Sequence, residues 1–270
     1  MAEFFDDIHS TYKSELGGEP LFIEDSPAVS KAKMELKDSS SYIALGKAYA
    51  KQLRYHEAIS AYTKALELSP DSYEAHRLRG GRYLTTLSTE EANQDLKWCL
   101  LNIELSAADG KEVDKKKTDV LYLLGLSSFY SEDYEKAVDY FERAIEYSDD
   151  EMGIAIIYRH TIASSRISRP LSLLEKRYNT SMKIGHHTAY DSVMRVWCGL
   201  SSPDKLLQQI EKDKNDLEYS MVVYGLSNYY RWKGEEKISR KLLLKVLSRD
   251  SFWISFAFIG AWNDENRRVL

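Results

Sequence analysis

The sequence predicts an all-α fold: an α-solenoid of about six stacked antiparallel helical hairpins, followed by a C-terminal capping helix. Helix breakers are few, with 13 glycines and 5 prolines in 270 residues, which favours long helices. Apolar residues recur three and four positions apart, a spacing that places them on one helical face. Glycine recurs after 34 residues, at Gly46 and Gly80, and a period of this length is typical of stacked helical hairpins.

The first hairpin is predicted over residues 39–72. The face of its first helix carries Tyr42, Leu45, Gly46 and Tyr49, and the face of its second carries Ala58, Tyr62 and Ala65. Gly46 and Ala58 are small enough to let the two helices approach closely. Pro70 closes the hairpin because a proline cannot continue a helix.

This pattern, Tyr-x-x-Leu-Gly-x-x-Tyr followed by Ala-x-x-x-Tyr, Ala and Pro, resembles a tetratricopeptide repeat (TPR). Tyr42 stands where this family often has tryptophan, and Tyr62 stands where it often has phenylalanine. The resemblance implies a TPR-like right-handed superhelix, with a concave groove lined by the first helix of each hairpin. It also implies that a peptide or a partner protein binds in this groove.

Two further clear repeats are predicted at residues 73–106 and 118–151. The second carries Gly80, Ala92 and Cys99 at the positions of Gly46, Ala58 and Ala65, and the third carries Gly125, Ala137, Phe141 and Ala144. Cys99 is therefore interpreted as a small core residue. The polar residues from Ala107 to Lys117 are an insertion that either forms a loop or lengthens the neighbouring helices.

The rest of the chain is predicted to contain three divergent hairpins, at residues 152–185, 186–217 and 218–251, and a cap at residues 252–270. The Arg169-Pro170 pair is expected to open a helix from Leu171 to Met182, since proline is favoured at a helix start.

In the last hairpin, Lys237 and Lys241 occupy the positions of Ala58 and Tyr62. Two explanations stay open. Either the buried residues shift by one position, to Ile238 and Leu242, or the packing is looser.

The N-terminal segment, residues 1–38, is predicted to be a helix and arm distinct from the repeats. Glu3–Leu16 has the pattern of an amphipathic helix, and Pro27 is expected to limit any helix before Ser30. The arm either packs across the first hairpin or becomes ordered on binding a partner.

The composition excludes several classes of function. A net charge of −5 argues against a general nucleic-acid or membrane-surface binder, and no apolar stretch reaches the length of a membrane span. Cys99 and Cys198 are too few for a disulfide framework, which favours a reducing, cytoplasmic compartment. Acidic residues near Met1 replace the basic residues of a signal peptide, so export is not expected.

No catalytic or metal-binding pattern is recognised, and no cofactor is expected. His186 and His187 have Asp191 nearby, but adjacent histidines on a helix point apart, so they are interpreted as an exposed turn. His160 is interpreted as a core or groove histidine rather than a catalytic base. The sequence therefore does not favour an enzyme.

The resemblance implies binding residues on the first helix of each hairpin. Carried over by register, the candidate groove residues are Lys47, Lys51, Arg77, Tyr122, Leu126, Tyr130, His160 and Tyr229. Basic residues come first and aromatic ones follow, which suits an extended peptide with an acidic or carboxylate group and apolar side chains. Tyr122 and Leu126 are equally compatible with a place in the core.

The predicted function is a non-catalytic protein–protein interaction module that binds a peptide or partner protein. The alternative is a self-assembling protein, with a homodimer formed through the apolar C-terminal helix. The aromatic residues that motivate it are Phe252, Trp253, Phe256, Phe258 and Trp262. A peptide-signal sensor is less favoured, because residues 1–38 are too short for the output domain that such sensors carry.

Overall fold

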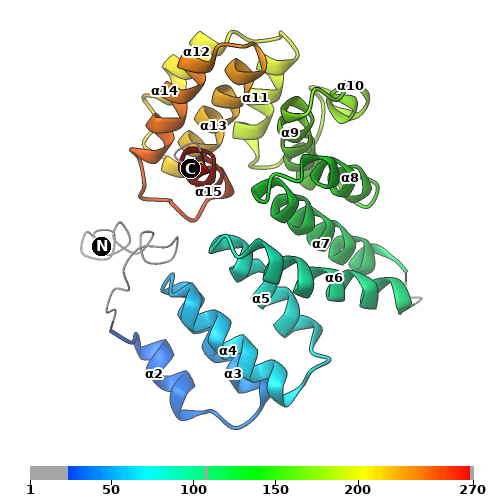
Figure 1. Cartoon of the computed structure of the whole chain (residues 1–270), viewed down its shortest axis with the longest axis vertical. Coiled ribbons are helices and arrows are strands. Elements are labelled where there is room, and N and C mark those ends of the chain that lie inside the picture. Colours follow the sequence, from blue (N-terminus) through cyan, green and yellow to red (C-terminus); the bar gives the residue numbers. More distant parts are fainter. Residues whose placement is uncertain (1–23, 107–108, 268–270) are drawn as a thin grey trace. The chain divides into compact units, whose positions relative to one another are not determined.

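The computed structural model in Figure 1 describes residues 24–106 and 109–267. All secondary structure in these ranges is helical, as the sequence predicts. The chain divides into two compact units, Met1–Ala108 and Asp109–Leu270, which we call unit 1 and unit 2 and describe separately. The helix predicted over Glu3–Leu16 lies outside the described residues.

Unit 1 contains two helix pairs preceded by a short helix. The elements are α2 (Pro27–Met34), α3 (Ser39–Lys51), α4 (Tyr55–Leu68), α5 (Tyr73–Thr85) and α6 (Thr89–Leu105). Helix α3 packs against α4, α4 against α5, and α5 against α6. The pairs α3–α4 and α5–α6 occupy the first two predicted repeats.

The turns inside the hairpins repeat as the sequence does. Leu53 between α3 and α4 has φ +59°, and Leu87 between α5 and α6 has φ +60°. Glu132, in the corresponding turn of the first hairpin of unit 2, has φ +64°. In each clear repeat, the residue at this position of the turn therefore has the left-handed backbone conformation that joins the two helices.

Glycine is required where the helices of a hairpin meet. A Cβ atom on Gly46 would lie 2.4 Å from the Tyr62 ring, and one on Gly125 would lie 2.5 Å from the Phe141 ring. Both rings are fully buried. The repeated glycine therefore provides the space that the large ring of the second helix fills.

The described residues of unit 2 form nine further helices. These are α7 (Lys111–Tyr130), α8 (Tyr134–Ile145), α9 (Asp150–Arg166), α10 (Ser172–Arg177), α11 (Thr188–Trp197), α12 (Pro203–Ile210), α13 (Asp216–Trp232), α14 (Glu236–Leu247) and α15 (Phe256–Arg267). Because α7 begins at Lys111, most of the predicted insertion lengthens this helix. No helix of the described residues is long and apolar enough to cross a membrane.

Two predicted helix boundaries are wrong. The helix expected from Leu171 to Met182 ends at Arg177, because the Asn179 side chain accepts hydrogen bonds from the backbone and hydroxyl of Ser181 and forms a turn. Pro27, expected to limit any helix before Ser30, instead begins α2, with Ser26 as its N-cap.

The second helix of the last hairpin buries Ser239, Leu242, Leu243 and Val246. Leu242 is thus buried as one of the two explanations predicts, whereas Ile238 is exposed. Lys237 and Lys241 face solvent.

Helix α15 packs against α13 and α14, as Figure 1 shows for the dark red C-terminal helix. Trp253 and Phe258 are fully buried, and of the five aromatic residues expected to drive self-association only Phe252 is exposed, at 39%. These side chains are therefore used largely within unit 2.

Candidate functional site

The first helices of unit 1 present basic side chains. Lys47 and Lys51 are exposed on α3 one helical turn apart, and Arg77 on α5 is half-buried. Lys47 Nζ lies 2.5 Å from Glu74 Oε1, which links the exposed faces of α3 and α5. We call Lys47, Lys51 and Arg77 the basic wall of unit 1.

Gly81, one turn beyond Arg77, adds a further feature to α5. A Cβ atom built on Gly81 would meet no heavy atom within 4 Å. The backbone there does not need glycine for packing, in contrast to Gly46.

The candidate residues on α7 are buried in unit 2. Leu126 and Tyr130 are fully buried and Tyr122 is 7% exposed. The Tyr130 hydroxyl donates to the Phe256 carbonyl at 2.8 Å, and the Tyr130 carbonyl accepts from Asn263 Nδ2 at 2.9 Å. The start and the middle of α15 therefore cover this face of α7.

His160 on α9 is also fully buried. Its Nε2 lies 3.3 Å from Glu142 Oε1 on α8 and 3.4 Å from the Ser172 hydroxyl on α10. Burial lowers the pKa of His160, although Glu142 acts in the opposite direction. His160 thus faces the second helices and not the tyrosines of α7.

Arg159, the preceding residue, is the one that faces those tyrosines. It is 2% exposed, and its guanidinium interacts electrostatically with Tyr122, Tyr130, Tyr158 and Tyr190. The guanidinium carbon lies 5.2 Å from the centre of the Tyr158 ring. Sequence analysis missed this residue, because its register placed His160 at the equivalent position.

No carboxylate of the described residues forms an ion pair with Arg159. Its Nε and Nη1 atoms are buried without a hydrogen-bond partner, whereas the Tyr190 hydroxyl interacts with both the guanidinium and Tyr122. Burial raises the pKa of Tyr130, Tyr158 and Tyr190, so these hydroxyls stay neutral. A permanent cation is therefore enclosed by neutral groups, and we call this group the Arg159 cluster.

Tyr229 on α13 remains half-buried and belongs to an aromatic surface. Its ring lies 5.5 Å from that of Trp197 and 6.1 Å from that of Trp232, which is exposed. Lys233 Nζ lies 4.4 Å from the centre of the Trp232 ring. This surface offers aromatic faces and a positive charge to solvent.

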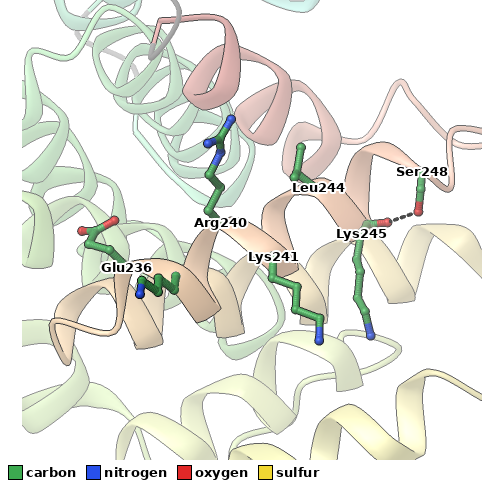
Figure 2. Close-up of a pocket in the computed structure, with 7 residues that line it drawn as sticks. Glu236, Arg240, Lys241, Leu244, Lys245 and Ser248 are labelled. Atoms are coloured by element: carbon green, nitrogen blue, oxygen red, sulfur yellow. Dashed lines mark hydrogen bonds between the residues drawn. The ribbon is translucent and has the colours of Figure 1, made fainter.

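A shallow depression of about 670 Å³ lies along α14 and is shown in Figure 2. It is lined by Glu236, Lys237, Arg240, Lys241, Leu244, Lys245 and Ser248. Arg240 pairs with Glu265 and Lys245 with Glu211. Its charges are in part neutralised by these acids, and its lining residues come from α14 and its C-cap, Ser248.

The two adjacent histidines lie in the turn before α11 and not inside a helix, as the sequence interpretation expects. His186 and His187 precede α11, and their ring centres are 4.3 Å apart. Asp191, the acid considered with them, instead accepts hydrogen bonds from Tyr178 and Arg195. Glu151 in the first turn of α9 approaches both imidazoles.

Comparisons with known proteins agree with the repeat pattern. Two family models, each described as a tetratricopeptide repeat, match residues 39–72 and 118–151. These bounds are those predicted for the first and third clear repeats.

Eleven chains of solved structures also match. One is the "Crystal structure of YrrB: a TPR protein with an unusual peptide-binding site", which aligns over 90% of this chain and 100% of that chain with 13% identity and a TM-score of 0.43. This likeness is too low to bear on function. No curated protein matches the sequence.

Proposed function

Because this chain is a tetratricopeptide-repeat protein, we propose that it is a non-catalytic interaction module that binds a peptide or partner protein through an acidic group. The binding group is the Arg159 cluster of unit 2. The basic wall of unit 1 is a separate surface for acidic residues of the partner.

The observation that carries this proposal is the unpaired Arg159. A buried charge is costly unless it is paired and hydrogen-bonded. Two guanidinium nitrogens lack a hydrogen-bond partner among the described residues, so the protein without a ligand is destabilised by the buried charge. An anion that binds to the guanidinium removes this destabilisation. Arginine is also the residue best shaped for two parallel hydrogen bonds to a carboxylate.

A carboxylate fits the cluster better than a phosphate does. Arg159 supplies one positive charge, and the tyrosine hydroxyls around it are neutral and add no charge. One carboxylate neutralises this centre, whereas a phosphate group carries about −1.5 to −2 charges at neutral pH and would leave a net negative charge in the interior. Access requires the ring of Tyr122 or Tyr190 to turn aside, since these two retain 7% and 8% exposure.

The basic wall supports a partner with further acidic residues. Lys47 and Lys51 are exposed on one face of α3, so they attract negative charge during the encounter, and this contribution falls with increasing salt. The proposal includes a reducing compartment such as the cytoplasm, because two cysteines are too few for a disulfide framework.

The test is selection of binding peptides from a random display library with free C-termini, using the full chain. We expect enrichment of peptides that contain Asp, Glu or a required C-terminal carboxylate. Arg159→Met should weaken binding of a selected peptide by about 30-fold or more, because losing one partner of a buried charge pair costs about 2–5 kcal/mol.

Arg177→Met, which changes an exposed arginine of α10, is the matched control and should leave affinity unchanged. Replacing the essential acid of the peptide by its amide should reproduce the loss seen with Arg159→Met. Equal affinities for wild type and Arg159→Met would overturn the role of the cluster. Charge reversal of Lys47, Lys51 and Arg77 to Glu tests the basic wall independently, through a reduced association rate at low salt.

A further inference from the structure

One carboxylate and two imidazoles meet between α9 and the segment that precedes α11. Glu151 Oε1 lies 3.1 Å from His186 Nδ1 and 3.9 Å from His187 Nε2. One ligand atom from each of the three residues lies within 4.8 Å of the other two. Glu151 and the histidines are far apart in the sequence, so the fold creates this group.

Local structure holds the segment against the start of α9. Gly185 has φ +55°, a conformation that favours glycine, and it lies directly against the Glu151 carboxylate, since a Cβ atom there would lie 2.7 Å from Glu151 Oε1. Two residues before it, the Lys183 amide donates to Asp150 Oδ2 at 2.9 Å. These features place the carboxylate beside the imidazoles.

The two imidazoles differ in how they are held. The His187 ring is stacked on Tyr190 at 5.5 Å, which restricts its orientation. The His186 side chain is 83% exposed, so it can rotate toward an ion at little cost and is open to solvent. One ligand is therefore fixed and one is adjustable.

From this geometry we propose that Glu151, His186 and His187 form a zinc-binding site. Two imidazole nitrogens and one carboxylate oxygen are a donor set that zinc uses, with a fourth position left for water. Ligand atoms around a tetrahedral zinc ion are separated by about 3.3 Å, given bonds of about 2.0–2.1 Å. The two measured separations, 3.1 and 3.9 Å, require only small shifts.

The choice of zinc follows from the ligand types. Imidazole nitrogen suits Zn²⁺ and the neighbouring transition metals, whereas Mg²⁺ and Ca²⁺ prefer sites made of oxygen atoms. A bound ion would connect the first turn of α9 to the segment before α11. It would thus stabilise unit 2, and it would adjoin the Arg159 cluster, because the His187 ring is stacked on Tyr190.

Isothermal titration of Zn²⁺ into the full, tag-free chain tests the proposal. We expect saturable binding of one ion per chain and no comparable heat with Mg²⁺. Glu151→Gln, His186→Ala and His187→Ala should each weaken Zn²⁺ binding by about 10-fold or more. His56→Ala, at an exposed histidine of unit 1, is the matched control and should bind as the wild type does.

A second measurement guards against loss of structure in the variants. The circular dichroism of each variant without metal should equal that of the wild type, while the increase of the melting temperature by Zn²⁺ should disappear only in the three site variants. Absence of saturable Zn²⁺ binding would overturn the proposal. Binding that survives in the Glu151→Gln/His186→Ala/His187→Ala triple variant would do the same, because the ion would then lie elsewhere.

Discussion

Arg166 Nη2 lies 2.6 Å from Asp264 Oδ2, so a buried ion pair joins the last residue of α9 to α15. Both side chains are nearly inaccessible, at 7% and 6% exposure. Asn228 accepts from the same guanidinium, and the Tyr224 hydroxyl donates to Asp264 at 3.1 Å. Three helices of unit 2, α9, α13 and α15, therefore meet in one hydrogen-bonded network.

Removing the acid of this pair should strongly destabilise unit 2. Asp264→Ala leaves a buried guanidinium without its charge partner, so we expect the free energy of unfolding to fall by about 3–5 kcal/mol. Urea denaturation followed by circular dichroism measures this change, and faster amide hydrogen exchange in α15 should accompany it. The control is Glu146→Ala, which breaks the exposed pair with Arg177 and should cost at most about 1 kcal/mol. Equal effects of the two substitutions would contradict the importance of the buried network.

Two glycines of unit 1 should respond oppositely to the same change. Gly46→Ala places a Cβ atom within 2.4 Å of the buried Tyr62 ring, and overpacking of this kind costs about 1–3 kcal/mol. Gly81→Ala meets no neighbouring atom, so it should raise the free energy of unfolding by up to about 1 kcal/mol through helix propensity. Thermal melts of both variants beside the wild type give the comparison. If Gly81→Ala lowers the free energy of unfolding, the prediction is wrong and the space beside Gly81 is filled.

The sequence predicts the fold well because its main determinants are local. Gly46 lies opposite Tyr62 in the first repeat and Gly125 lies opposite Phe141 in the third, so the same pair of glycine and large ring recurs within a hairpin. Helix type, pairing and order follow from such contacts, since each hairpin packs mainly on its neighbours. Helix ends are less predictable, as at Arg177, because one Asn side chain can form a turn that competes with the helix.

The site residues are only partly predictable because they depend on contacts between distant segments. Tyr122 and Tyr130 belong to the Arg159 cluster, but their burial is completed by α15, which the repeat pattern does not position. The repeat register assigns His160 to the position that faces the tyrosines, and an error of one residue along α9 is enough to miss Arg159. An arginine within an otherwise apolar stretch of α9 was the available signal. Glu151 gives no such signal, because only the path of the chain before α11 brings it to His186.

The Arg159 cluster predicts a conflict between stability and binding. Arg159→Met replaces a buried cation that has no ion-pair partner in the described part of the chain by an apolar side chain of similar length, which removes the cost of burying the charge. The variant should therefore unfold at a urea concentration equal to or higher than the wild type while losing affinity for acidic peptides. Urea titrations without peptide and with a saturating selected peptide separate the two effects. A large loss of stability in the variant would mean that Arg159 is a structural residue whose charge is already compensated.

The buried His160 predicts a dependence of stability on pH. Burial lowers its pKa in the folded protein below the ordinary value of 6.5, so the unfolded chain binds a proton at a higher pH than the folded chain does. As pH falls below about 6.5, protonation stabilises the unfolded state, and the free energy of unfolding decreases until the folded pKa is passed. His160→Gln removes this contribution, so its stability should decrease less than that of the wild type between pH 7 and pH 5. Urea titrations across this range test the difference. If the free energy of unfolding changes with pH in the same way for wild type and variant, His160 has the same pKa in the folded and unfolded states, which contradicts the prediction. The difference between the two proteins at pH 7 measures the packing lost in the variant.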